Sequence, residues 1–295
     1  MMDLGDRMKR AEQSTRTNLI YRCPAILRID GRAFHTFTRG FNKPWDWRFH
    51  WCMFETAKTL CSEISSAKFA YGQSDEISIL LTDYDTLQTE QWFGGSVQKI
   101  VSVAASIATL AFNKAVNDML KGLETRFGSY VTDDGLMWSK RFQATFDARV
   151  FSIPKEDVAN YFVWRQQDAV RNSIQMLGRS VFYHSSLWNK NCDEIQEKLW
   201  QQHKINWNDC PTIQKRGWAA YRFDHVDADG IKEPFGKNLQ FPGSFDSLIK
   251  KPKWAIDIDI PTFTKYRKFI ETWLDPIDMP WYNREENLSQ GENDE

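Results

Sequence analysis

The chain has 295 residues, of which 42% are hydrophobic and 26% are charged, and its net charge is −1. This length and balance exclude a disordered chain and allow a sizeable core in one large or two small domains. The cysteines are odd in number and never spaced Cys-x-x-Cys, so the sequence indicates neither a disulfide framework nor a zinc site and favours a reducing compartment.

The N-terminus, Met1-Met2-Asp3-Leu4-Gly5-Asp6, is too acidic for a signal or transit peptide, and no apolar run approaches the length of a membrane span. We therefore expect a cytoplasmic protein with no membrane partner. The acidic tail from Asn283 to Glu295 has a net charge of −4, so the rest of the chain carries +3. This balance permits a local basic patch for a polyanion.

The first half of the chain contains alternating strand and helix signals. In chain order we predict a helix over 4–15, a strand over 24–29, a helix over 46–64 with Asp46 as N-cap, hairpin strands over 68–71 and 77–81, a helix over 95–117, a mobile loop over 124–137 and a strand over 146–151. This order predicts an α+β, ferredoxin-like layout: a βαββαβ antiparallel sheet with its helices on one face. In that topology the end of the first strand lies beside the hairpin turn.

The second half reads as extensions of this sheet. Pro154 starts a helix that runs to about Leu177, on which Arg165, Asp168 and Asn172 share one face. Another helix follows a capping-box pattern that begins at Asn191. From these signals we predict a palm-like catalytic domain over 1–152, a helical continuation over 153–230, and a C-terminal lobe with the acidic tail over 231–295, including a strand over 255–260.

Two polar segments stand at predicted strand ends. Asp30-Gly31-Arg32 closes one apolar run, and Gly72-Gln73-Ser74-Asp75-Glu76 opens another. Carboxylates at adjacent strand ends can hold Mg²⁺ beside phosphates, because Mg²⁺ takes a few oxygen ligands and keeps positions for water and substrate. The arrangement suggests phosphoryl or nucleotidyl transfer, although Asp-Gly is first of all a turn dipeptide.

The chain resembles the tRNA-histidine guanylyltransferase superfamily of reverse, 3′ to 5′ polymerases in motifs that occur in order as far as about Tyr221. These are Arg28-Ile29-Asp30-Gly31-Arg32-Ala33-Phe34-His35, Lys43-Pro44-Trp45-Asp46, Tyr71-Gly72-Gln73-Ser74-Asp75-Glu76, Lys99, and Trp164-Arg165-Gln166-Gln167-Asp168. The resemblance implies a polymerase-like palm, two Mg²⁺ ions, ATP and GTP or other nucleoside triphosphates as substrates, tRNA as partner, and a homo-oligomer, commonly a tetramer.

The resemblance also implies roles for particular residues. Metal coordination falls on Asp30, the carbonyl of Gly31, and Asp75, with Glu76 beside them and Lys43 near the reacting phosphates; we take Asp30, Asp75, Glu76 and Lys43 as the catalytic set. Triphosphate and nucleotide contacts fall on Arg28, Gly31, Arg32, Ala33, Phe34, His35, Ser74 and Lys99. Contacts to RNA fall on Arg165, Asp168, Asn172, Lys215 and Arg216.

One departure from the family pattern refines the expected function. Enzymes that guanylate histidine tRNA carry His-Ile-Asn-Asn soon after the Trp-Arg-Gln motif, where this chain has Ala169-Val170-Arg171-Asn172. The chain therefore resembles the guanylyltransferase-like branch, which repairs 5′-truncated tRNA by template-dependent addition after ATP or GTP activates the 5′-monophosphate. The alternatives are a histidine-tRNA-specific guanylyltransferase, a nucleotide cyclase on the same palm, and a non-catalytic RNA-binding protein.

Overall fold

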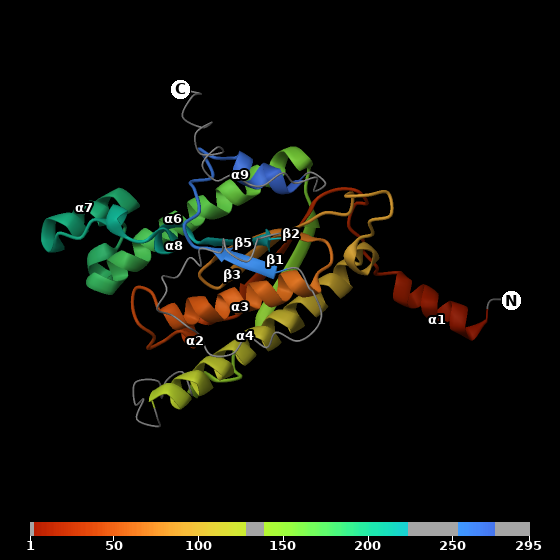
Figure 1. Ribbon diagram of the computed structural model, residues 1–295, viewed down its shortest axis with the longest axis horizontal. Helices are drawn as coiled ribbons and strands as arrows, with labels where there is room; N and C mark the ends of the chain where they lie inside the picture. The colour runs from red at the N-terminus through yellow and green to blue at the C-terminus, as the bar shows by residue number, and fades with distance from the viewer. Residues whose placement is uncertain (1–2, 128–138, 224–252, 275–295) are drawn as a thin grey trace.

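One mixed layer structure contains the part of the chain that the computed structural model describes, residues 3–127, 139–223 and 253–274 (Figure 1). Within these residues the strands form a single antiparallel sheet in the order β4-β1-β3-β2-β5-β6. The strands are β1 (Ala25–Gly31), β2 (Ala67–Gln73), β3 (Glu76–Leu81), β4 (Phe146–Ser152), β5 (Trp218–Phe223) and β6 (Lys253–Asp257). The prediction of an antiparallel sheet combined with helices is confirmed.

Helices cover both faces of this sheet (Figure 1). The α-helices are α1 (Leu4–Gln13), α2 (Phe34–Phe37), α3 (Trp47–Glu63), α4 (Val97–Phe127), α6 (Val158–Val181), α7 (Cys192–His203), α8 (Thr212–Arg216) and α9 (Lys268–Glu271). The short 3₁₀ helices are η1 (Trp92–Gly95), η3 (Lys155–Asp157), η4 (His184–Leu187), η5 (Trp207–Asp209) and η6 (Thr272–Leu274). Helices α3 and α4 pack on one face, whereas α6 and α9 pack on the other.

The alternation of side chains along the strands explains these two layers. On β1, Leu27 and Ile29 are buried in the core that contains α3 and α4, whereas Ile26 is buried in the core that contains α6 and α9. All six residues of β3 are buried, because helices cover both of its faces. Apolar area removed from water on both sides stabilises this central strand, at about 25 cal/mol per Å².

Local sequence signals account for the helices around the first half of the sheet. Asp46 accepts a hydrogen bond from the backbone N–H of Arg48 and caps α3 as predicted. Helix α4 is long and apolar enough over Val97–Gly122 to cross a membrane by length and composition alone. Its stripe of Ile100, Ala104 and Phe112 is buried against the sheet and α3, as in the core helix of a folded domain.

The structure extends some predicted elements and adds others. Helix α4 continues to Phe127, so the start of the predicted loop over 124–137 is helical, and residues 128–137 lie outside the described ones. The predicted strand over 255–260 is observed as β6, from Lys253 to Asp257. This strand pairs with β5, and Phe269 of α9 packs in the same core as Ile26. The division into stretches 1–152, 153–230 and 231–295 stays a prediction, and the described part of the third stretch contributes to the common sheet.

Candidate active site

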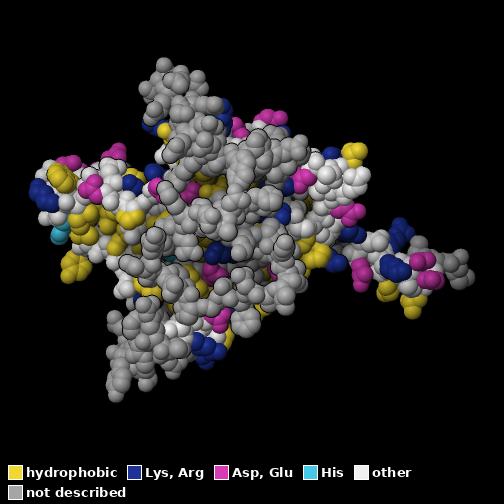
Figure 2. Space-filling model, in the orientation of Figure 1, with side chains coloured by type: hydrophobic (Ala, Val, Ile, Leu, Met, Phe, Trp, Pro, Cys, Tyr) yellow, Lys and Arg dark blue, Asp and Glu magenta, His cyan; other side chains and the backbone are white. Residues whose placement is uncertain are grey.

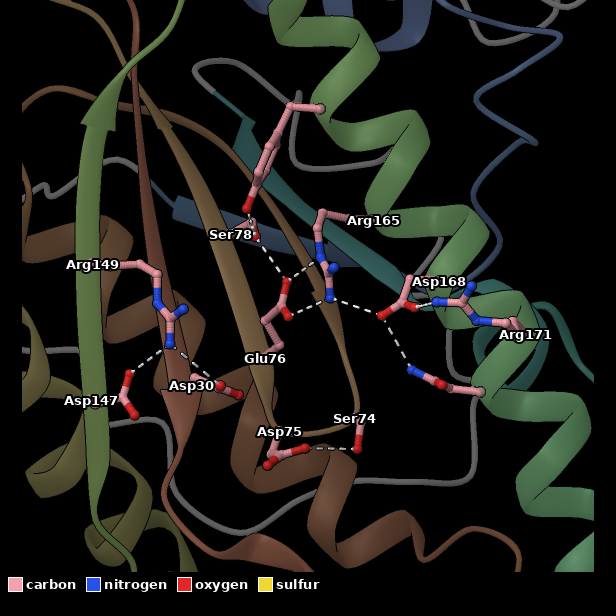
Figure 3. Close-up of polar contacts among 12 residues, drawn as sticks. Asp30, Ser74, Asp75, Glu76, Ser78, Asp147, Arg149, Arg165, Asp168 and Arg171 are labelled. Carbon is pink, nitrogen blue, oxygen red and sulfur yellow. Dashed lines mark hydrogen bonds and ion pairs between the residues drawn. The ribbon is translucent and has the colours of Figure 1, made fainter.

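The two polar segments singled out in the sequence meet at one edge of the sheet. Because β1 and β3 are antiparallel neighbours, Asp30 at the end of β1 lies opposite Glu76 at the start of β3. The backbone N–H of Gly31 donates to the carbonyl of Asp75 at 3.1 Å. Ser74 turns the chain between β2 and β3 with a left-handed φ of 48°, and its hydroxyl donates to Asp75 Oδ1 at 2.9 Å (Figure 3).

Gly31 is required by the packing at this edge. A Cβ atom at this position would lie 2.4 Å from the ring of Phe34, which is buried among Phe37, Phe49, Phe112 and Phe146. The absence of a side chain therefore lets the backbone after Asp30 turn closely over this aromatic cluster.

A row of three carboxylates crosses the sheet at the same edge. Asp147 on β4, Asp30 on β1 and Glu76 on β3 are register partners and lie on one face (Figure 3). Arg149 contacts Asp147 at 3.4 Å, and Arg165 of α6 donates to both oxygens of Glu76 at 2.7 and 2.6 Å. Among the ion pairs of the described residues, the central Asp30 has only a 4.0 Å contact with Arg149. Asp30 is therefore the member of the row with most capacity left for a cation.

The carboxyls of this edge are poised to accept positive charge. Burial raises the pKa of Asp75 to about 6, and the neighbouring charges of Asp30 and Glu76 raise it further against the hydrogen bond from Ser74. Burial also raises the pKa of Asp30, with the charge of Asp147 acting in the same direction and Arg149 opposing it. Ionised carboxylates in this position are disfavoured until a cation joins them, which is a common property of functional sites.

Glu76 links this edge to helix α6. In addition to its bidentate contact with Arg165, it accepts a hydrogen bond from the hydroxyl of Ser78 at 3.2 Å, and Ser78 bonds Tyr161 at 2.8 Å. Arg165 also donates to Asp168 at 3.2 Å. Both oxygens of Glu76 are thus engaged within the protein, so this residue holds α6 against the sheet edge.

A cavity of about 790 Å³ opens beside the carboxylates, a size within the range of sites for small molecules. The predicted site residues that line it are Asp30, Gly31, Ala33, Phe34, His35, Lys43, Ser74, Asp75, Glu76, Arg165, Asp168 and Asn172. The structure thus brings together residues from β1, the segment before α3, the β2–β3 turn and the α6 face. Segments far apart in the sequence form one polar site.

Other predicted site residues lie outside this cavity lining. Arg28 is inside the sheet face one step from Asp30, and Arg32 is exposed beyond the end of β1. Lys215 and Arg216 belong to α8, where their backbone carbonyls accept hydrogen bonds from Ser173 and Tyr71. Their roles in nucleotide or RNA contact stay predictions.

The structure does not bring Lys99 to the carboxylates within one chain. Its neighbour Ile100 lies beside Ala25 and Leu81, the pair at the opposite end of the β1–β3 register, and Lys99 itself sits over the ring of Phe93. The reason is topological: β3 runs away from Asp75, so the helix that follows it begins at the far end of the sheet.

Sequence reasoning missed several polar residues at this edge. Asp147 and Arg149 alternate on β4 with buried residues, and Tyr161 stands on α6 one turn before Arg165. The two-residue spacing on β4 could have indicated a polar strand face, although it does not say which strand lies next to it.

The raised pKa of Asp75 gives a pH-dependent stability that can be measured. Because the folded pKa of about 6 exceeds the ordinary 3.8, the folded protein binds more protons, and the stability falls as pH rises between these values. We expect Asp75→Asn to raise the free energy of unfolding in EDTA, by about 2 kcal/mol at pH 7.5 and by less at pH 4.5. Urea unfolding at both pH values measures this. An equal effect at both would contradict the assignment.

An acidic sheet edge beside a large cavity with cationic walls defines an enzyme of the phosphoryl- or nucleotidyl-transfer class. The family model for tRNA(His) guanylyltransferase matches residues 5–154. The chain belongs to this family, and it is a nucleotidyltransferase.

Relatives of known structure extend the similarity over nearly the whole chain. A bacterial tRNA(His) guanylyltransferase-like protein in complex with ATP is 37% identical, with a TM-score of 0.73, over 93% of this chain and 100% of that one. Such a protein in complex with GTP is 38% identical, with a TM-score of 0.68, over 92% and 98% of the two chains. An uncharacterized protein of Acanthamoeba polyphaga mimivirus is 27% identical over 78% of this chain and 80% of its own length.

Proposed function

We propose that this enzyme adds nucleotides in the 3′ to 5′ direction to the 5′ end of truncated tRNA, directed by the opposite strand, after ATP or GTP has activated the 5′-monophosphate. The observation that carries the proposal is the meeting of Asp30 and Asp75 at the wall of a cavity that also presents Lys43 and Arg165. Similarity to guanylyltransferase-like proteins in complex with ATP and with GTP supports nucleoside triphosphates as substrates.

The residues at the sheet edge fit two Mg²⁺ ions. Asp30 has oxygen atoms without a close ion pair among the described residues, and Asp75 lies next to Gly31 through a backbone hydrogen bond. These carboxylates and the Gly31 carbonyl form an all-oxygen donor set, which hard cations prefer. When bound, the ions would lower the pKa of an attacking hydroxyl and neutralise the triphosphate and its leaving pyrophosphate.

The chain's own side chains would bind and orient the reactants. His35 and Lys43 line the cavity and are exposed, so they can reach phosphate oxygens as donors. Arg165 is held by Glu76 and Asp168 and keeps the α6 face fixed beside the carboxylates. A rigid alignment of hydroxyl and phosphate accounts for a large share of catalysis in such reactions.

The α6 face supports the repair branch of the family. Where histidine-specific enzymes carry His-Ile-Asn-Asn, Ala169 is buried, Arg171 is exposed and pairs with Asp168, and Asn172 donates to Asp168 at 3.3 Å beside the cavity. These residues can position a backbone without reading a base, so the choice of nucleotide falls to pairing with the opposite strand. A histidine-specific guanylyltransferase is the alternative. A cytoplasmic location and a tetramer also stay predictions.

Truncated tRNAs test the proposed function. We expect the enzyme to extend several tRNAs that lack their first nucleotide, and to add whichever nucleotide pairs with the opposing base. The measurement is the addition of each of the four nucleotides to tRNAs of different identity, with the opposing base changed in turn. A strict preference for guanylate and histidine tRNA would favour the alternative, and cyclic product formed from triphosphate alone would indicate a cyclase.

A further inference from the structure

Two arginines lie side by side on the sheet face next to the carboxylate row. Arg28 of β1 and Arg149 of β4 are register partners on adjacent antiparallel strands. Like charges directly opposite each other destabilise a sheet, so folding alone gives no reason for this pair. The Nε atom of Arg28 is buried and has no hydrogen-bond partner among the described residues. An anion between the two guanidinium groups would satisfy both observations.

Arg149 is held in place while much of its guanidinium group stays accessible. It contacts Asp147 at 3.4 Å and Asp30 at 4.0 Å, and its side chain is 51% exposed (Figure 3). A guanidinium has five N–H donors, so several remain available. Loss of the long contact to Asp30 would leave Arg149 still anchored by Asp147.

The arginine pair and the cavity lie on different sides of Asp30. Figure 3 shows Asp30 between Arg149 on one side and Asp75 on the other, and neither Arg28 nor Arg149 lines the cavity. A nucleotidyl transfer needs two reactants to reach the same carboxylates. The enclosed side has the volume for a nucleotide, whereas the open sheet face at the edge strand β4 is accessible to a larger molecule.

We propose that Arg149, oriented by Asp147 and paired with Arg28, binds the 5′-terminal phosphate of the RNA substrate on the side of Asp30 away from the nucleotide cavity. This inference rests on the proposed function, because it names the group by which the RNA is held for addition. Arginine suits this task because its planar donors bind phosphate oxygens in pairs. Asp147 is a positioning residue that acts through Arg149.

The test compares binding of truncated tRNA with a 5′-monophosphate and with a 5′-hydroxyl, at one fixed ionic strength. We expect the wild-type protein to bind the phosphorylated RNA about tenfold or more tightly, the scale of a charge-assisted hydrogen bond. Arg149→Gln should abolish this preference and leave the affinity for the 5′-hydroxyl RNA unchanged. Asp147→Asn should reduce the preference, and Arg149→Lys should retain part of it.

The matched control is Arg267→Gln, an exposed arginine that pairs with Glu271 of α9 beyond the opposite part of the sheet. It should keep the full preference. A wild-type protein without a preference, an unchanged preference in Arg149→Gln, or an equal loss of affinity for both RNAs would each overturn the inference. If the preference depends on Arg149 but no variant, wild type included, extends the RNA, then the proposed function fails while the phosphate site stands.

Discussion

Replacement of Asp30 or Asp75 by alanine should reduce nucleotide addition by about 10³-fold or more, while the protein stays folded. Each change removes a carboxylate from an edge where negative charges repel one another in the absence of a cation, so the fold does not depend on it. Single-turnover addition to truncated tRNA gives the rates. Mg²⁺ should also raise the melting temperature of the wild-type protein more than that of either variant.

A surface carboxylate supplies the control for this pair of changes. Asp118 lies on the exposed side of α4, and Asp118→Ala should leave both the rate and the Mg²⁺ response unchanged. Near-wild-type rates in Asp30→Ala or Asp75→Ala would refute the assignment of these residues to metal coordination.

Arg165→Met should lower the free energy of unfolding by about 3–5 kcal/mol, the usual cost of leaving a buried charge without its partner. The side chains of Arg165 and Glu76 are only 7% and 10% exposed, so water cannot replace the lost hydrogen bonds at Glu76. Addition should fall as well, since α6 loses its link to the sheet edge. Urea unfolding at pH 7.5 measures the stability.

The double variant Glu76→Gln with Arg165→Met separates a buried charge from general damage to packing. It should recover most of the lost stability, because no uncompensated carboxylate remains, while addition stays impaired. A double variant less stable than Arg165→Met would show that the pair matters mainly through its packing.

Local chemistry in the sequence determined much of the site. Asp30-Gly31 and Ser74-Asp75 were recognisable because polar residues interrupt apolar strand runs, and a change from period 2 to polar turn residues is visible in any single sequence. The caps at Asp46 and Asn191 were equally local, since each side chain bonds a backbone N–H within three residues. The predicted hairpin and the helices followed from these signals, and the family resemblance placed them in order.

Only the tertiary structure decided which of these groups act together. Glu76 and Arg165 are 89 residues apart, and the Asp147–Asp30 contact row depends on β4 pairing with β1, which no spacing in the sequence specifies. The same holds for Lys99, which the chain direction after β3 carries away from the carboxylates, and for the edge strands β5 and β6. Periodicity shows which face of an element is buried, but the choice of neighbour is set by the free energy of packing summed over the whole core, where each contact is weak and local residues carry no record of their distant partners.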